Sequence, residues 1–137
     1  MIRPMSDLPY ALVVDSPLPH AAAVARTTEA LAAEGFGIVS TIDLQATMKA
    51  KLGKDVEPHT ILGACAPPIA YQAITVEEGI GVLLPCNVVV RGRPDGGSRI
   101  FLTKVDAMLG LVGRADIGPL ADDVGARLEA VRQVLRG

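Results

Sequence analysis

The chain has 137 residues, a length that fits one domain and suffices for a hydrophobic core without a metal or a disulfide. Half of the residues are hydrophobic but only 3% are aromatic, so Ala, Val, Leu and Ile must build most of the core. The formal net charge of −2 provides no positive field that would attract nucleic acid or an anionic membrane surface. We therefore expect neither nucleic acid nor membrane among its partners.

The sequence shows no targeting or membrane segment. A transmembrane helix needs about 20 apolar residues, and the longest apolar run, 80–90, is shorter and is interrupted by Pro85 and Asn87. The N-terminus lacks the apolar segment of a signal peptide, and two cysteines without a secretion signal are typical of free thiols in a reducing compartment. We expect a cytoplasmic protein in which residues 1–9 form a flexible lead-in and residues 10–137 form one domain.

The first third of the chain alternates strand and helix patterns. Residues 10–16 have a β-branched centre and end in turn formers, which predicts a strand. An alanine-rich segment follows and stops at Gly35, as helices do. Residues 37–44 predict a second strand, and residues 44–53 a short helix with leucine and methionine four positions apart.

Prolines bound the elements in the middle of the chain. Residues 57–66 predict a third strand, and residues 67–79 predict a helix because prolines start it and a glycine ends it. The apolar residues 80–84 and 86–91 predict one strand, bent at Pro85.

The C-terminal third predicts a hairpin and then helices. Residues 92–99 contain the Pro, Asp-Gly and Gly of a turn, and residues 99–105 predict the antiparallel partner strand. The last segment carries one apolar stripe at helical spacing: Leu120, Val124, Leu128, Val131 and Leu135. The order β-α-β-α-β-α-β-β-α predicts a single compact α+β domain with a mixed or mainly antiparallel sheet.

Cys65 and Cys86 are candidate reactive thiols. A thiolate needs a nearby positive charge or a helix N-terminus, and Cys65 lies just before the proline-initiated helix. Cys86 follows Pro85 in an apolar run and is more protected. Their separation excludes a Cys-x-x-Cys pair, but they could meet across neighbouring strands. The competing interpretation is that both are small buried hydrophobic residues, the commoner role of free cysteine.

Polar residues near these cysteines are candidate binding groups. Lys51 belongs to a basic cluster that either receives an anion or is the solvated end of a helix. His59 shares a strand face with Cys65 but lies about 20 Å along it, so joint ligation would need a bend or a second subunit. Zinc needs four converging ligands, which are absent, so we predict no metal site.

Asn87 and Pro85 interrupt the apolar run and complete the candidate set. A buried amide costs about 1–3 kcal/mol unless it is hydrogen-bonded. We therefore expect Asn87 either to face away from Cys86 and bond across an interface, or to help form a pocket. Neither a Gly-x-Ser-x-Gly motif nor a Ser-His-Asp set is present, so the pattern predicts no particular reaction.

Four segments carry a resemblance to a known family: "KLG" (51–53), "ILGAC" (61–65, with Pro67), "AYQAI" (70–74) and "IGVLLPCNVVV" (80–90). In this order they resemble the bacterial domain of unknown function 302 family, over nearly the whole chain. The resemblance implies a compact α+β fold and a homodimer, without a settled activity. It maps the recurring family positions onto Lys51, Gly53, Cys65, Pro67, Pro85, Cys86 and Asn87.

The chain departs from that family pattern at two places. Ala66 stands where asparagine is usual, and Val105-Asp106-Ala107 where Asp-Pro is more typical. The first departure removes a polar group beside Cys65.

Three functional hypotheses follow. The first is a homodimeric module that binds a small ligand or a partner. The second is thiol chemistry, with Cys65 as sensor or nucleophile, assisted by Lys51, and Cys86 as the resolving residue. The third is metal or haem ligation by Cys65 or His59 at a dimer interface, which the scarcity of aromatic residues disfavours.

Overall fold

The computed structural model describes residues 5–136 and is built around a five-stranded sheet in the order β1-β5-β4-β3-β2. Every neighbouring pair of strands is antiparallel. The strands are β1 (Ala11–Ser16), β2 (Gly37–Asp43), β3 (His59–Cys65), β4 (Cys86–Gly92) and β5 (Ser98–Thr103).

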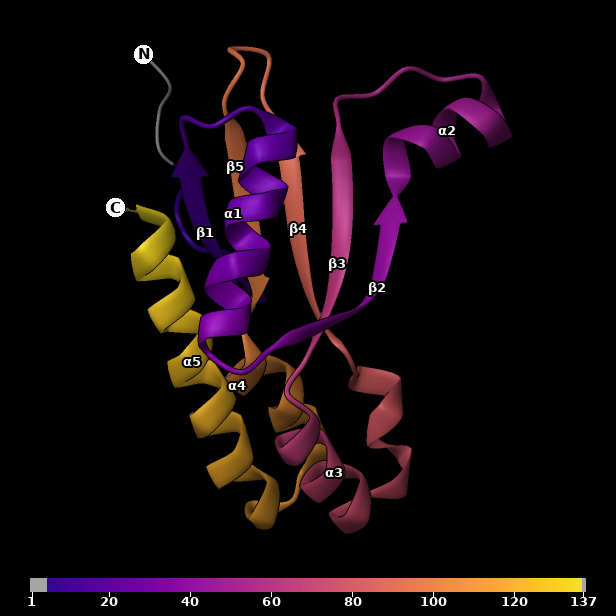
Figure 1. Cartoon of the computed structure of the whole chain (residues 1–137). Coiled ribbons are helices and arrows are strands. Elements are labelled where there is room, and N and C mark those ends of the chain that lie inside the picture. Colours follow the sequence, from indigo (N-terminus) through magenta and orange to yellow (C-terminus); the bar gives the residue numbers. More distant parts are fainter. Residues whose placement is uncertain (1–4, 137) are drawn as a thin grey trace.

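Helices cover one face and one end of this sheet (Figure 1). The α-helices are α1 (His20–Ala33), α2 (Leu44–Leu52), α3 (Pro67–Val76), α4 (Val105–Leu109) and α5 (Gly118–Arg136). Three 3-10 helices lie in the connections: η1 (Glu78–Leu83) between α3 and β4, and η2 (Gly110–Val112) and η3 (Ala115–Ile117) between α4 and α5. The α+β class and the order of elements predicted from the sequence are confirmed. None of the helices in residues 5–136 is long and apolar enough to cross a membrane.

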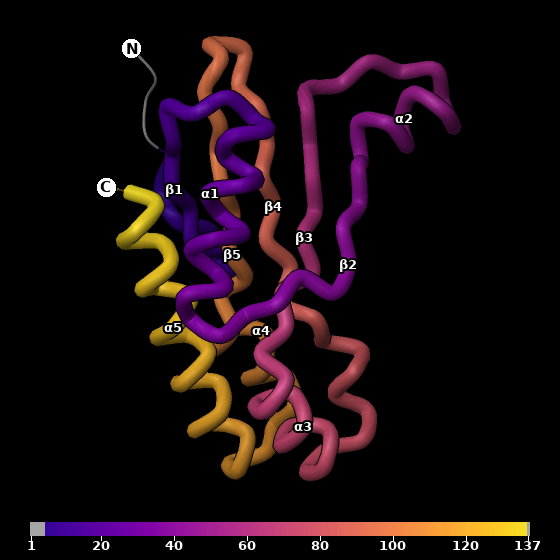
Figure 2. The backbone as a smooth tube through the Cα atoms, in the orientation of Figure 1, coloured from indigo at the N-terminus to yellow at the C-terminus, as the bar shows by residue number. Residues whose placement is uncertain are grey.

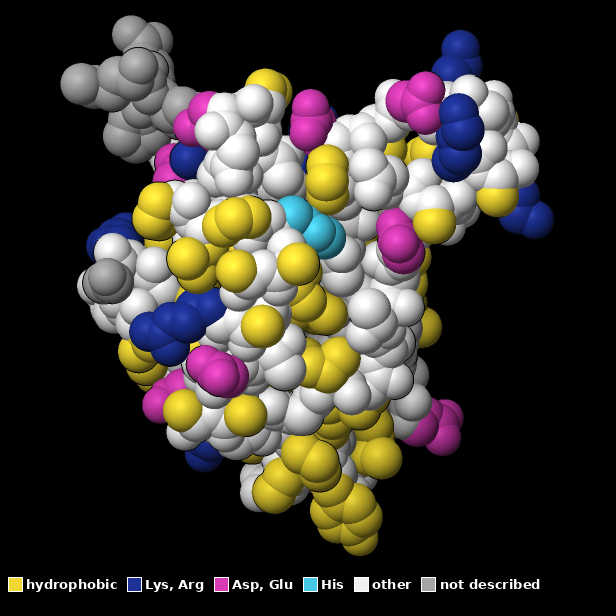
Figure 3. Space-filling view, turned by 45° about the horizontal axis from the view of Figure 1, so that its top comes forward, with side chains coloured by type: hydrophobic (Ala, Val, Ile, Leu, Met, Phe, Trp, Pro, Cys, Tyr) yellow, Lys and Arg dark blue, Asp and Glu magenta, His cyan; other side chains and the backbone are white. Residues whose placement is uncertain are grey.

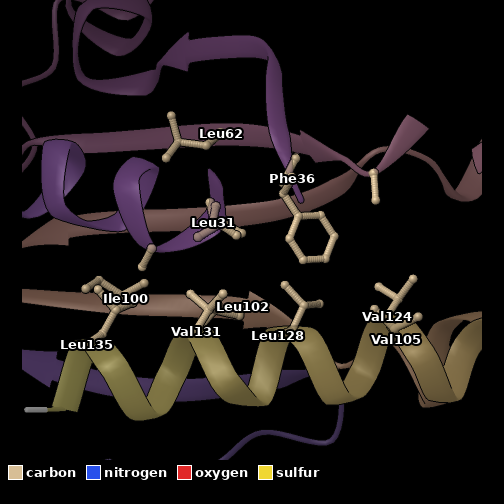
Figure 4. Packing of buried hydrophobic residues seen from close by; sticks show 14 of the residues in the cluster. Leu31, Phe36, Leu62, Ile100, Leu102, Val105, Val124, Leu128, Val131 and Leu135 are labelled. Atoms are coloured by element: carbon tan, nitrogen blue, oxygen red, sulfur yellow. The ribbon is translucent and has the colours of Figure 1, made fainter. Parts of the chain in front are cut away.

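The core lies between the sheet and helices α1 and α5 (Figure 4). Alternate residues of the central strands point into it, among them Val88, Ile100 and Leu102, each at most 1% exposed. The predicted stripe of α5 supplies the opposing surface, where Leu128 and Val131 are fully buried. Aliphatic packing of this kind is what the low aromatic content requires.

One predicted strand segment is wrong. Residues 80–84 do not belong to β4. Most of them form η1 (residues 78–83), whose Ile80 side chain is buried. A short, wholly apolar run carries no alternation, so periodicity does not separate a buried strand from a buried helical turn.

The N-terminal lead-in is attached to the domain from Asp7 onward. The Asp7 carboxylate accepts hydrogen bonds from the backbone N–H of Val13 at 2.9 Å and from the guanidinium of Arg132. Residues 1–4 of the predicted lead-in lie outside the described residues.

Residues 37–58, which we call the β2–α2 arm, begin at the edge of the sheet and project with α2 away from the other helices (Figures 1 and 2). The arm comprises β2, α2 and the loop that returns to β3. No residue of the arm is buried. Its strand hydrogen-bonds to β3 on one side only, so β2 is an edge of the sheet.

Candidate functional site

A small apolar cavity lies where β3 ends and β4 begins. Its volume is about 40 Å³, and side chains from α3, α4 and α5 line it together with the strand ends. The antiparallel register places Ala64 opposite Cys86, so the two cysteine-bearing strand ends meet at this point. Among the residues that line it are Cys65, Pro85, Cys86 and Met108. Both cysteines that the sequence singled out therefore border this cavity.

Cys86 is the more deeply perturbed thiol. Burial in the apolar surroundings, with a smaller contribution from the neighbouring Cys65, raises the pKa of Cys86 to about 11. A thiol with this pKa is protonated at neutral pH, and the thiol form is a poor nucleophile. This weakens the hypothesis that Cys86 resolves an oxidised Cys65.

The helix after Cys65 does not supply the donors expected from the sequence. Its first two residues, Pro67 and Pro68, have no N–H group. The next two N–H groups, of Ile69 and Ala70, both donate to the carbonyl of Ala66, at 3.0 and 2.9 Å. The start of α3 therefore offers no free N–H to stabilise a thiolate at Cys65.

Lys51 and His59 lie at the other end of the sheet from the cavity. Strand β2 begins opposite Cys65 and ends opposite Thr60, and α2 starts directly after it, so Lys51 is on the far side of the strand length. Lys51 is exposed, as the solvated interpretation of the basic cluster predicts. Burial, then the charges of Arg91 and His20, lower the pKa of His59. Neither residue assists Cys65.

Asn87 and Pro85 take different roles at the start of β4. Asn87 is exposed on the sheet face opposite to Cys86, paired with Gly63. Its backbone carbonyl accepts a hydrogen bond from Thr103 Oγ1 at 2.7 Å. Because the side chain of Asn87 is exposed, its amide carries no desolvation cost. It does not line the cavity. The Pro85 ring lies so close to Gly63 that a Cβ there would be 2.8 Å from Pro85 Cγ, which explains a glycine in the middle of β3.

The cavity is too small for two of the ligands that the sequence left open. Sites for drug-sized ligands have volumes of about 300–1,000 Å³. A cavity of about 40 Å³ does not admit a haem or an organic ligand of that size. Within residues 5–136, no three His, Cys, Asp or Glu side chains converge as a metal site would require.

Two features of the site region escaped the sequence interpretation. Met108 adds a third sulfur to the cavity, although it lies in a segment read only as helical. Asp15 of β1 accepts hydrogen bonds from Arg93 at 2.9 Å and Arg99 at 2.7 Å. Asp43 caps α2 through Ala46 N–H. The sequence shows Arg93 and Arg99 in and beside the predicted turn, but the pairing of β1 with β5, which brings them to Asp15, is seen only in the structure.

Comparisons with known proteins agree with this fold. A family model described as "Domain of unknown function DUF302" matches residues 12–135. The chain is also similar to a crystal structure of an uncharacterized conserved DUF302 protein from Bacillus stearothermophilus. The two share 27% sequence identity and a TM-score of 0.83, over 92% of this chain and 98% of that one. No curated protein sequence matches.

Proposed function

This chain belongs to the DUF302 family, and from the geometry above we propose that it is a homodimeric partner-binding module in which the β2–α2 arm joins two copies. The observation that carries the proposal is the complete absence of buried residues between positions 37 and 58. A strand and a helix that bury nothing in their own chain gain little packing free energy there, and helices depend mostly on packing for stability.

The arm exposes large apolar side chains. Val39 is 64% exposed, Leu52 65%, Ile42 46% and Val56 40%. Exposed large apolar side chains gathered on one segment are typical of interaction sites in folded proteins.

The arm is nevertheless held in one shape by polar contacts of its own. The Gln45 side chain donates to the carbonyl of Val56 at 3.0 Å, and Lys49 pairs with Asp55 at 3.0 Å. A surface that keeps its shape before association loses less conformational entropy on binding.

A second copy of the chain suits this surface best. The arm carries three lysines and three acidic residues, so it is neutral overall and its charges are intermingled (Figure 3). A surface of mixed charge is complementary to itself about a two-fold axis, whereas a strongly charged partner would need one sign. Stable interfaces use about 20–30 residues a side, which is about the size of the arm.

The alternatives are less well supported. The cavity is smaller than the site an organic ligand needs. Thiol catalysis lacks an activating group, because Lys51 lies at the other end of the sheet and α3 offers no free N–H.

Leu52→Glu tests the proposal. Leu52 is exposed in the single chain, so a charge there leaves the fold intact but places an unpaired carboxylate in the proposed interface. We expect the wild-type chain to sediment as a dimer at about 100 µM and the variant to dissociate at least about 100-fold more readily. Analytical ultracentrifugation over a concentration series measures both.

The matched control is Leu111→Glu. Leu111 is 77% exposed and lies outside the arm, so the same substitution there adds the same charge without touching the proposed interface. The control must remain dimeric. A monomeric wild-type chain at the highest concentration, or equal weakening by both substitutions, would refute the proposal.

A further inference from the structure

Strand β2 leaves one side of its backbone without a partner strand. It is the last strand in the sheet order and pairs only with β3. In an antiparallel ladder, alternate residues direct their N–H and C=O groups to opposite sides, so about half of these groups in β2 point away from β3. Such an edge is a template on which a further strand can pair.

The other edge of the sheet, β1, is partly covered by the chain itself. The Asp7 carboxylate accepts a hydrogen bond from the backbone N–H of Val13 at 2.9 Å. Leu8 and Ala11 exchange backbone hydrogen bonds at 2.9 and 3.2 Å. The two edges therefore differ, and β2 is the one that remains open to a partner.

The sequence of β2 does little to discourage pairing. Edge strands are commonly protected by Lys, Pro or charged side chains along the strand. The strand GIVSTID has neither Lys nor Pro, and its one charged residue, Asp43, is the last. A bulge between Ile38 and Ser40 is the one protective feature it carries.

We propose that β2 pairs antiparallel with β2 of a second copy, so that two five-stranded sheets join into one. The inference rests on the proposed function, because it specifies how the arms of two copies meet. A two-fold axis perpendicular to the sheet places identical edge strands antiparallel. This direction also puts Asp43 near the Gly37 end of the other strand, whereas parallel pairing in register would set two aspartates side by side.

The same symmetry brings two exposed apolar surfaces together. Helix α2 follows the Asp43 end of β2, whereas α3 and η1 follow β3 beyond the Gly37 end (Figure 1). Because antiparallel pairing reverses the second copy, α2 of each chain arrives at the end where its partner carries η1. Leu52 of α2 is 65% exposed and Val82 of η1 is 89% exposed, and this arrangement covers both.

A second copy therefore suits the edge better than an unrelated strand. A foreign peptide could pair with β2, but it would leave the apolar side chains of α2 and η1 in water. Two copies bury both surfaces twice, once on each side of the axis.

Amide hydrogen exchange, followed by NMR, tests the strand pairing. The samples are the dimeric wild-type chain and the Leu52→Glu variant, which we expect to be monomeric. Within residues 38–42, amides that point to β3 should be protected in both proteins. Those that point outward should exchange at least about 10-fold more slowly in the dimer, because only there do they have a hydrogen-bond acceptor.

Val82→Glu tests the contact between α2 and η1. Val82 is exposed in the single chain, so the substitution leaves the fold intact and places a carboxylate against an apolar surface only in the dimer. We expect dimerisation to weaken by at least about 10-fold in analytical ultracentrifugation. The matched control is Val134→Glu near the end of α5, where the side chain is 45% exposed and dimerisation should not change. Thermal melting confirms that both variants are folded.

Each failure points to a different step. A wild-type dimer whose outward β2 amides exchange as fast as in the monomer would overturn the strand pairing. A folded Val82→Glu variant that dimerises like the wild type would overturn the antiparallel arrangement. A monomeric wild-type chain would refute the proposed function itself and this inference with it.

Discussion

At Cys86, burial and a neighbouring thiol act on ionisation in the same direction. Both favour the neutral thiol, because an apolar environment disfavours charge and a second thiolate nearby would repel the first. The residue therefore behaves as a small apolar side chain at neutral pH. Cys86 is therefore unsuited to nucleophilic chemistry at neutral pH.

The pH profile of alkylation tests the state of Cys86. Its pKa is raised from 9.0 to about 11, so the thiolate fraction at pH 8 is about 100-fold below that of an ordinary cysteine. We expect iodoacetamide to modify Cys86 correspondingly slowly, with a rate that rises tenfold per pH unit until about pH 11. Site-resolved mass spectrometry follows the reaction.

Steric protection alone would give a different profile. Slow access lowers the rate but leaves its plateau near pH 9, as in the urea-unfolded chain, which serves as the control. A plateau near pH 9 in the folded protein would contradict the raised pKa.

At the scale of elements, the sequence predicts best where one local signal suffices. The apolar stripe of α5 identifies the residues that are buried, including Leu128 and Val131. The Asp95-Gly96 turn between β4 and β5 is equally local, since Gly96 has a φ of 92° that favours glycine. Residues 80–84 were misassigned because their signal is hydrophobicity without a period.

The arm shows what such signals leave out. Leu44, Met48 and Leu52 follow helical spacing and predict α2 correctly, but the same spacing ordinarily implies burial, and here none of the three is buried. An apolar stripe indicates that a surface is to be covered and does not specify which molecule covers it. In the cavity, likewise, sequence brought out both cysteines but not Met108, whose approach depends on how α4 packs.

Asp43→Ala tests how α2 is held. The Asp43 carboxylate accepts a hydrogen bond from Ala46 N–H at 2.9 Å, and α2 has no buried side chain to support it otherwise. Loss of an N-cap costs about 0.5–2 kcal/mol. We expect faster amide hydrogen exchange in residues 46–52 and an almost unchanged global free energy of unfolding.

The comparison region is α5, whose amides should keep their protection because its core contacts do not involve the arm. Slower or equal exchange in α2 would show that other contacts hold the helix. A large global destabilisation would contradict the independence of the arm.

At the scale of the whole molecule, two ion-pair clusters attach the N-terminal part of the chain to the rest. Asp7 joins Arg132 of α5, and Asp15 of β1 joins Arg93 and Arg99 of the hairpin. The hydrogen bond from Arg132 is the main cause that lowers the pKa of Asp7. For Asp15, burial opposes ionisation, but the hydrogen bonds from Arg99 and Arg93 outweigh it and its pKa is also lowered.

Acid titration of stability tests these clusters. A carboxyl whose pKa is lower in the folded state than the ordinary 3.8 adds stability above pH 3.8, and that stability is lost as pH falls through the folded pKa. Asp15→Asn should therefore lower the free energy of unfolding by about 1.5–3 kcal/mol at pH 7, the range for hydrogen bonds to charged groups. The deficit should shrink towards zero as the wild-type carboxylate protonates.

Urea unfolding between pH 2 and 7 measures this deficit. Asp55→Asn is the control, because the Asp55 side chain is 86% exposed and its ion pair contributes at most about 1 kcal/mol. A deficit that is the same at pH 2 and pH 7 would mean that Asp15 acts through packing and not through its charge.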